Sequence, residues 1–293
     1  MIRRSRWGGW NGWTIPAFVL AAMISLVPWL IMIYNSFLDT SYTNLNSGDF
    51  IGLDNYRRAF SDPAFTTSLW NTVKIMLIAL PLEFVIGLFL AMLVWKHLKL
   101  RKFVVPIIII PMIISPSVVG LIWNLNLNPV FGPVGIWLSE SGLSPNGLFA
   151  DVNTALLTIT MIDVWQWTPF MFLLFLAGLV GVPKEPLEAA AVNNASALQT
   201  FWHIILPALR PIMITGFLLR FTDLYKIFDT IWITTVGGPG LATETVSVFG
   251  YRVNFLYWHI GYGSAVVFII FLVSYVACLI FSHTVVKPEK KLD

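Results

Sequence analysis

Six long apolar runs limit what this chain can fold into. They lie near residues 14–38, 70–95, 103–125, 154–181, 208–236 and 262–286. A helix needs about 20 apolar residues to cross about 30 Å of hydrocarbon, so each run is long enough to span a bilayer. Inside lipid, only helices and closed barrels satisfy all of their own backbone polar groups. The pattern predicts an all-α integral membrane protein with six transmembrane helices.

The composition supports this prediction. The chain is 57% hydrophobic and 11% charged, whereas about a quarter of the residues in a soluble domain are charged. The single cysteine, Cys278, excludes an intrachain disulfide and a Cys-based zinc site. The first run is longer than the signal-peptide core of about 7–15 residues, so we expect it to remain as an anchor. Without a repeat or a dividing linker, residues 1–293 are expected to form one transmembrane domain.

Lysine and arginine indicate the orientation. With the N-terminus inside, three of the eighteen lie outside, at Arg57, Arg58 and Arg252, and three lie within the runs, at Lys74, Arg220 and Lys226. The other twelve lie in cytoplasmic segments, at Arg3, Arg4, Arg6, Lys96, Lys99, Arg101, Lys102, Lys184, Arg210, Lys287, Lys290 and Lys291. Cytoplasmic loops carry an excess of Lys and Arg. We therefore expect both termini and the loop 184–207 to face the cytoplasm.

The loop 184–207 is half-polar and too short in apolar residues to span the bilayer. Its first part predicts a helix with Pro186 in the first turn and Glu188 near the positive end of the helix dipole. Asn194 can end this helix, because asparagine tolerates the left-handed conformation that follows a helix C-terminus.

A second helix is predicted directly afterwards. Ser196 and Gln199 have the spacing of a capping box, which starts a helix, and Pro207 is expected to end it. The loop thus reads as a cytoplasmic helix–turn–helix. An amphipathic helix lying on the lipid surface is the alternative, although the segment lacks the Lys/Arg-rich polar face of an interfacial anchor.

At this point the residues carry a family resemblance. The loop contains, in order, Glu188-Ala189-Ala190, Asn193-Asn194-Ala195, Ile204, Leu206 and Pro207. This resembles the EAA loop of ABC-importer permeases, which reads E-A-A, two residues, D-G-A and, further on, I-x-L-P. Asn193 and Asn194 replace the Asp-Gly of that pattern, so the turn is retained but a charge is lost.

Four other segments resemble the carbohydrate-uptake branch of that family, the maltose- and glycerol-phosphate-type permeases. They are IGLDNYRRAFSDPAF, VVGLIWNLNLNPVFG, WQWTPFMFLLFLAGL and FDTIWITTVGGPGLATETVSVFGY. The resemblance runs from about residue 15 to residue 285 and implies a permease of the bacterial cytoplasmic (inner) membrane that takes up a sugar, oligosaccharide or polyol. It also implies partners: a second homologous permease, two ATP-binding subunits and an extracytoplasmic binding protein, with membrane lipid around them and no nucleic acid.

In such permeases the EAA loop docks on the ATPase subunit. The resemblance assigns this coupling role to Glu188, Ala189, Ala190, Asn193, Asn194 and Pro207. The chain itself contains no G-x-x-x-x-G-K-[ST] phosphate loop. ATP and Mg are therefore expected on the partner subunits, and no cofactor is expected in this chain.

The fifth run suggests a substrate pathway. Arg220, Asp223, Lys226 and Asp229 alternate in charge at three-residue intervals, so neighbours could pair on one helix. One interpretation is a self-neutralising structural ladder. The other is that Asp223 and Asp229 line the passage, because charges within membrane spans face protein or water. Further candidates for the pathway are Asn124, Trp165, Trp167 and Tyr225.

Enzymatic chemistry is not expected. The four histidines are scattered, and the sequence has no zinc-protease motif, nucleophile elbow or evident clustered acidic pair. Two other transport classes stay open: a proton-coupled secondary carrier that uses Asp223 and Asp229 as a relay, and a channel, which is disfavoured because no filter-like motif is present.

Overall fold

The computed structural model describes residues 14–44, 48–96 and 101–285. Within these residues the chain is helical and contains no strand. The described residues form two compact units, drawn from 1–62 with 250–272 and from 63–249 with 273–293. The predicted cytoplasmic cations Arg3, Arg4, Arg6, Lys99, Lys287, Lys290 and Lys291, and the expected end of the last span at 286, lie outside the described residues.

Five helical runs in the described part of the chain are long and apolar enough to cross a membrane. They are α1 (Thr14–Asn35), α3 (Pro63–Lys96), α7 (Ala155–Val180), the run Ala197–Thr234 and α13 (Ile260–Val285). A sixth crossing results if α4 (Arg101–Ile113) and α5 (Pro116–Asn126) count as one span. The predicted all-α, multi-span membrane fold is confirmed.

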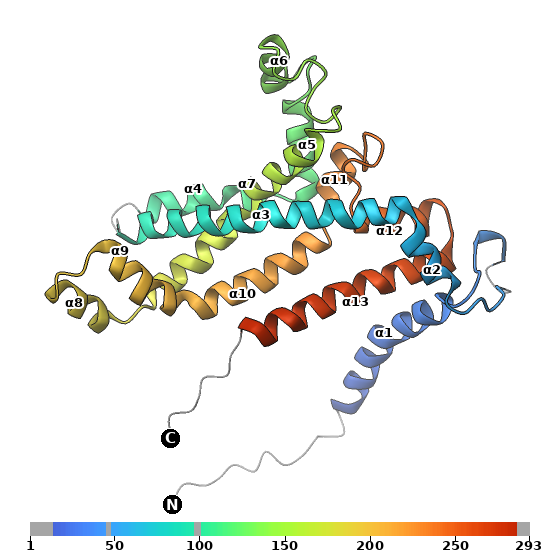
Figure 1. Cartoon of the computed structure of the whole chain (residues 1–293), viewed down its shortest axis with the longest axis horizontal. Coiled ribbons are helices and arrows are strands. Elements are labelled where there is room, and N and C mark those ends of the chain that lie inside the picture. The colour runs from blue at the N-terminus through green and yellow to red at the C-terminus, as the bar shows by residue number, and fades with distance from the viewer. Residues whose placement is uncertain (1–13, 45–47, 97–100, 286–293) are drawn as a thin grey trace, which may run out of the picture. The chain divides into compact units, whose positions relative to one another are not determined.

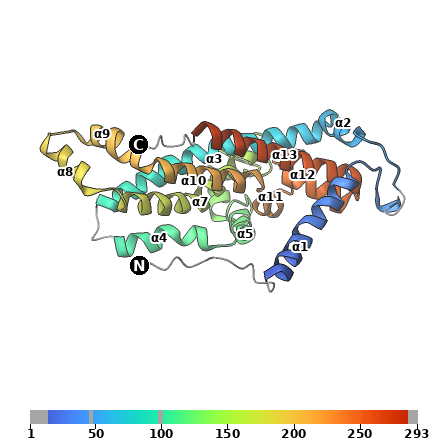
Figure 2. The ribbon, with the colours of Figure 1, turned by 90° about the horizontal axis from the view of Figure 1, so that it is seen from below.

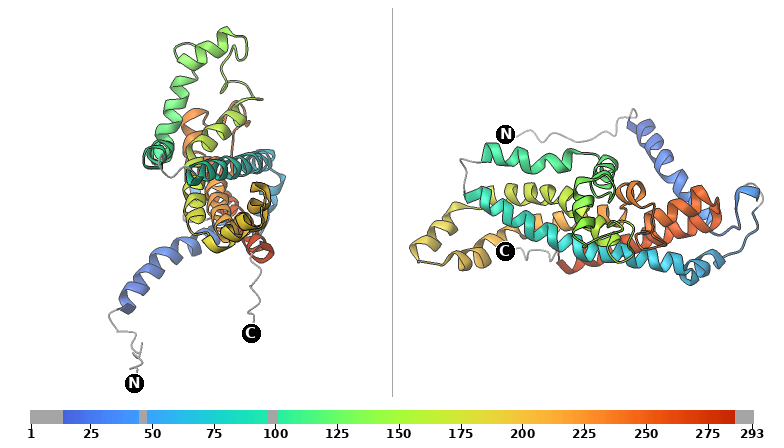
Figure 3. Two further views of the ribbon diagram at one scale, coloured as in Figure 1. Left: turned by 90° about the vertical axis from the view of Figure 1, so that its left-hand side faces the viewer. Right: turned by 90° about the horizontal axis from the view of Figure 1, so that it is seen from above.

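The predicted third span, 103–125, is not one continuous helix, because α4 and α5 meet at 91°. Pro116 begins α5, and Ser115 before it has an extended ψ of 139°. A proline disfavours the helical conformation of the residue before it, and it fits the first turn of a new helix. The bend therefore occurs at the Ser115–Pro116 step. Figure 3 shows the green segment with α5 and α6 (Pro133–Glu140) leading away from the teal α3.

The core of the second unit lies where α3, α7 and α10 (Leu206–Tyr225) pack together (Figure 1). Its buried side chains are Ala91, Val94, Met171, Phe172, Phe175, Leu176, Leu179, Ile205 and Leu209. A Cβ atom at Gly87 would lie 2.8 Å from the Cβ of Met171. Small residues let membrane helices approach closely, so Gly87 and Ala91, one turn apart, bring α3 against α7.

The first unit contains α1, α2 (Asp54–Ser61) and the start of α13. Asn55 donates hydrogen bonds to the carbonyls of Ser36 and Leu38 at 3.0 and 2.9 Å. The Tyr262 hydroxyl donates to Asp62 at 2.8 Å. The apolar side chains of α1 remain largely exposed within the chain, Ile24 to 67%. A helix that is apolar all round suits a lipid environment.

Between α7 and α10 the chain forms a hairpin of α8 (Lys184–Val192) and α9 (Ala197–Thr200). Figures 1 and 2 show this α8–α9 hairpin beyond the ends of α7 and α10. The remaining described elements are the 3-10 turn Tyr42–Asn44, the π-helical turns Phe201–Ile205 and Arg252–Leu256, α11 (Asp229–Thr234) and α12 (Val246–Tyr251).

Candidate functional site

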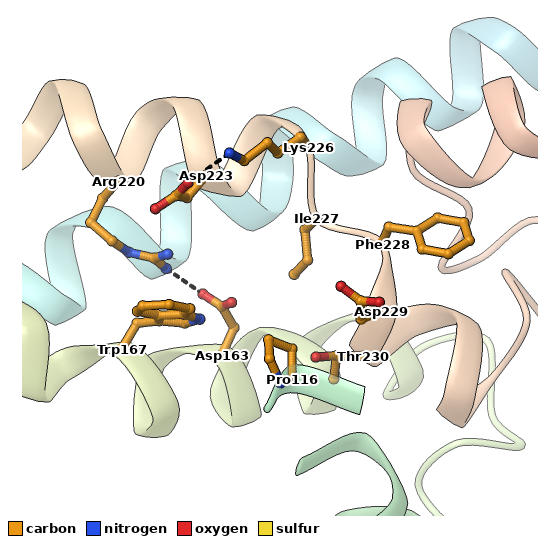
Figure 4. Close-up of a pocket in the computed structure, with 10 residues that line it drawn as sticks. All are labelled: Pro116, Asp163, Trp167, Arg220, Asp223, Lys226, Ile227, Phe228, Asp229 and Thr230. Atoms are coloured by element: carbon orange, nitrogen blue, oxygen red, sulfur yellow. Dashed lines mark hydrogen bonds and ion pairs between the residues drawn. The ribbon is translucent and has the colours of Figure 1, made fainter. Parts of the chain in front are cut away.

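A pocket forms where three helices of the second unit begin or end. The helix α10 stops at Tyr225, α11 starts at Asp229, and α5 starts at Pro116. Together with one face of α7 they enclose a cavity of about 160 Å³ (Figure 4). We call this the α10–α11 pocket; its lining is Pro116, Asp163, Trp167, Arg220, Asp223, Lys226, Ile227, Phe228, Asp229 and Thr230.

A tertiary contact satisfies a main-chain carbonyl at the break between α10 and α11. The buried Thr245 hydroxyl donates to the Ile227 carbonyl at 3.0 Å, so a side chain from another segment satisfies this carbonyl. Main-chain groups freed from a helix within a membrane need such partners. The predicted fifth span, 208–236, is therefore two helices, and Asp229 does not continue the helical face of Arg220 and Asp223.

Arg220 forms the innermost part of the pocket. Its side chain is 1% exposed and donates from Nε and Nη2 to the two carboxylate oxygens of Glu83, each at 2.6 Å. Nη2 also donates to Asp163 Oδ2 at 2.6 Å. Charge-assisted, two-point bonds of this kind are strong and directional. They join α10 to α3 and α7 through one buried cluster, Glu83–Arg220–Asp163.

This cluster corrects two predictions. No ion pair joins Arg220 to Asp223 within the described ranges, because the guanidinium points to Glu83 and Asp163 instead. A clustered acidic pair, which the sequence did not reveal, exists after all. The two carboxylates come from runs 80 residues apart in sequence (163 minus 83), so only the packing of α3 against α7 brings them together.

Trp167 lies one turn after Asp163 on α7, and its ring faces the guanidinium carbon of Arg220 at 5.1 Å. A cation over an indole ring is attracted by the ring's negative face. The arrangement holds the indole at the pocket wall, and Figure 4 shows the ring beneath Arg220.

The outer part of the pocket is more exposed. Lys226 Nζ lies 3.1 Å from Asp223 Oδ1, an i,i+3 pair that the charge spacing predicted. Asp229 is exposed at the start of α11. In the described part of the chain its carboxylate has one hydrogen-bond partner, the Ser117 hydroxyl at 3.4 Å.

The structure brings three of the predicted pathway residues together: Trp167, Asp223 and Asp229 line the α10–α11 pocket. The other three lie elsewhere. The Asn124 amide donates to the Ile233 and Thr234 carbonyls at 3.3 and 3.2 Å and so ties α5 to α11.

Trp165 and Tyr225 also lie off the pocket. Trp165 packs edge-on against Trp123 at 5.5 Å and lines two apolar cavities, one between α3, α4 and α7 and one between α5 and α7. Tyr225 is 5% exposed and stacks on Phe221.

The sequence pattern missed Glu83 and Pro116, although a carboxylate in an otherwise apolar run was a signal for Glu83.

The α8–α9 hairpin has the turn chemistry that the sequence predicts. Asn194 has a left-handed φ of 54°. The Ser196 hydroxyl accepts from Gln199 N at 3.2 Å while Gln199 Oε1 accepts from Ser196 N at 2.8 Å, which completes the capping box. One detail differs: α8 already begins at Lys184, so Glu185 lies in the first turn and Glu188 in the second.

Pro207 does not end the second helix, contrary to the prediction. Helix continues from Ala197 through Pro207 to Tyr225 because Phe201–Ile205 adopts π geometry. The Leu206 N–H donates to the Phe201 carbonyl five residues earlier. A wider π turn changes the carbonyl positions that a proline ring would otherwise meet in an α-helix.

The residues with a predicted coupling role lie at or near the hairpin surface. Glu188, Ala189, Asn193, Asn194 and Pro207 are exposed and Ala190 is half-buried. Three large apolar side chains nearby are also exposed: Val192 to 82%, Leu198 to 67% and Trp202 to 57%. Exposed apolar side chains gathered on a segment mark a surface for contact with protein or membrane.

The chain combines several membrane spans, a polar pocket between broken helices and the exposed α8–α9 hairpin. These are features of a membrane transport subunit. The chain belongs to the family of binding-protein-dependent transport system inner membrane components, whose model matches residues 83–291. It is the permease subunit of an ABC importer, as the EAA resemblance predicted, rather than a secondary carrier or a channel.

Individual relatives agree with this assignment. The chain is 35% identical to the trehalose/maltose transport system permease protein MalF of Thermococcus litoralis, over 81% of this chain and 78% of MalF. It is 30% identical to the sn-glycerol-3-phosphate transport system permease protein UgpA of Agrobacterium fabrum, over 94% and 93%. It shares its fold, with a TM-score of 0.81 at 20% identity over 95% of both chains, with a chain from a bacterial ABC transporter involved in the import of the acidic polysaccharide alginate.

Proposed function

We propose that this permease carries a sugar, oligosaccharide or polyol across the bacterial cytoplasmic membrane, and that the α10–α11 pocket is part of the pathway. The observation that carries the proposal is the pocket lining, in which the Trp167 ring and the carboxylates of Asp163, Asp223 and Asp229 border one cavity. Flat aromatic rings pack against the C–H faces of sugars, and carboxylates accept hydrogen bonds from hydroxyl groups. The names of the relatives, which include trehalose and maltose, point to the same substrate class.

The α8–α9 hairpin is proposed as the contact with the ATP-binding subunits, through Glu188, Ala189, Ala190, Asn193 and Asn194. Small side chains at Ala189 and Ala190 allow close approach by a partner. The exposed apolar side chains of Val192, Leu198 and Trp202 beside them would be removed from water by contact with that partner. Both ATP and Mg belong to those partner subunits in this proposal. Binding of ATP would draw the hairpins of the two permeases together and open the pathway outward, and hydrolysis would return it to the inside.

Assembly and orientation complete the proposal. This chain pairs with a second homologous permease, two ATP-binding subunits and an extracytoplasmic binding protein. A relative by fold is described in complex with an alginate pentasaccharide-bound periplasmic protein, at 21% identity and a TM-score of 0.78. The excess of Lys and Arg supports an orientation with both termini and the hairpin in the cytoplasm.

The test is uptake by the purified complex in proteoliposomes, with binding protein and labelled candidate sugars. Uptake should require ATP and survive a protonophore. Trp167→Ala should reduce the initial rate several-fold because it removes a pocket wall, while the complex still assembles. The matched control is Trp165→Ala, two residues away on α7 but outside the pocket. Equal uptake by both variants and the wild type, with every sugar offered, would contradict the assignment of the pocket.

A further inference from the structure

The charges of the α10–α11 pocket do not balance. Three carboxylates line it, from Asp163, Asp223 and Asp229, and two cations, Arg220 and Lys226. Counting the formal charges of the lining, two cations minus three carboxylates gives −1. In a site bordered by apolar helices such an excess acts on a charged solute more strongly than it would in water.

The positive charge of Arg220 is not available to a solute. Its side chain is 1% exposed, and Nε and Nη2 are bound by Glu83 and Asp163. The indole of Trp167 covers one of its faces at 5.1 Å. The buried cluster therefore offers a solute no anion-binding guanidinium.

The remaining charges point the same way. Lys226 is already paired with Asp223 at 3.1 Å, so the two cancel locally. The Asp229 carboxylate accepts one hydrogen bond, from Ser117, and has no cation beside it in the residues described. Asp229 thus leaves the unbalanced negative charge at the pocket edge.

We infer that the α10–α11 pocket selects by charge: it admits uncharged and cationic polyhydroxylated solutes and disfavours anionic ones such as uronates, sulfonates and phosphate esters. The inference rests on the proposed function and narrows its substrate class. Family membership does not decide this point, because relatives are named for trehalose and maltose, for sn-glycerol-3-phosphate and for an acidic polysaccharide. The charges that line this pocket favour uncharged sugars such as trehalose and maltose.

A thiol placed beside Asp229 can report the local potential without involving the selectivity of the binding protein. In the full complex, with Cys278→Ser to remove the native thiol, Ser117→Cys is treated with two methanethiosulfonates of similar size, one carrying a trimethylammonium and one a sulfonate. The control is Ser141→Cys, at an exposed position after α6. We expect the ratio of the cationic to the anionic rate at residue 117 to exceed the ratio at residue 141 by roughly tenfold.

Neutralising Asp229 separates this effect from simple access. Adding Asp229→Asn should lower the ratio at residue 117 several-fold, while Lys226→Gln should raise it, because that change leaves Asp223 without its counter-charge. An equal ratio at both positions, a preference for the anionic reagent, or no reaction with either would overturn the inference. If any of these results is found together with ATP-driven sugar uptake, the charge selectivity is wrong and the proposed function stands. If the cationic reagent is preferred but no ATP-driven sugar uptake is found, the proposed function is wrong and the local negative potential stands.

Discussion

At the scale of single residues, Arg220 determines the character of the pocket. It is a fully buried cation in a membrane span, and two carboxylates from two other helices bind it. Burying a charge in such surroundings is costly unless it is paired with good geometry. The three helices α3, α7 and α10 must therefore keep their mutual positions for the cluster to remain satisfied.

Removing this cation should destabilise the protein strongly. Arg220→Ala leaves Glu83 and Asp163 buried without their common partner, and breaking a buried pair costs about 3–5 kcal/mol. Lys226→Ala is the control, since its pair with Asp223 has side chains 73% and 39% exposed and such pairs contribute about 0–1 kcal/mol. The Tm of the purified complex should fall much more for Arg220→Ala.

A second variant shows whether uncompensated charge is the cause. Adding Glu83→Gln to Arg220→Ala removes one of the two stranded carboxylates, so part of the lost Tm should return. Similar Tm losses for Arg220→Ala and Lys226→Ala, or a further loss on adding Glu83→Gln, would mean that the cluster does not carry the stability assigned to it.

At the scale of elements, the sequence predicted the features that depend on neighbouring residues in the chain. The apolar lengths predicted the spans, the Ser196–Gln199 spacing predicted a capping box, and Asn194 was expected to take the left-handed turn that it does take. The break after Tyr225 was not predictable in this way. No glycine or proline lies between Lys226 and Phe228, and the Ile227 carbonyl at the break accepts from Thr245, a residue distant in sequence.

The same reasoning explains which site residues could be found. Asp223 and Asp229 are conspicuous as charges inside an apolar run, and both line the pocket. Their neighbours there come from α5 and α7, and the identity of those neighbours depends on the 91° bend and on helix packing. Periodicity within one run carries no information about either.

The π turn Phe201–Ile205 gives a prediction at this scale. Pro207→Ala restores an N–H and removes the ring, so regular α geometry becomes possible across the turn. A π turn holds one residue more than an α turn, so its conversion to α geometry would rotate α9 relative to α10 by about one residue, or about 100°. We expect lower transport per ATP hydrolysed, with the complex still assembled, when both rates are measured in proteoliposomes.

The control for this variant is Pro211→Ala, which changes a proline within the regular part of α10. It should leave the ratio of transport to hydrolysis near the wild-type value. If both proline variants keep that ratio, the orientation set by the π turn does not matter for coupling.

At the scale of the whole molecule, the hairpin and the pocket lie on the same helices. The α8–α9 hairpin connects α7 to α10, and both helices contribute to the pocket lining. From Leu206 to Tyr225, α10 has 20 residues, which at 1.5 Å per residue is about 30 Å. Because the Glu83–Arg220–Asp163 cluster joins α10 to α3 and α7, a displacement of the hairpin would move the pocket walls together.

This connection makes the hairpin surface the place to interrupt coupling. Ala189 is exposed, whereas Ala190 is half-buried within the chain itself, so Ala189→Trp adds bulk toward a partner without disturbing the hairpin. Overpacking a close contact costs about 1–3 kcal/mol. We expect Ala189→Trp, and also Ala190→Trp, to weaken recovery of the ATP-binding subunit in a pull-down and to abolish substrate-stimulated ATP hydrolysis, while Glu188→Ala has a milder effect.

The matched control is Ala150→Trp, an exposed alanine in the loop that we place outside the membrane. Unchanged recovery and hydrolysis for Ala189→Trp, with membrane insertion verified, would mean that the ATP-binding subunit docks elsewhere and that the α8–α9 hairpin is not the coupling element.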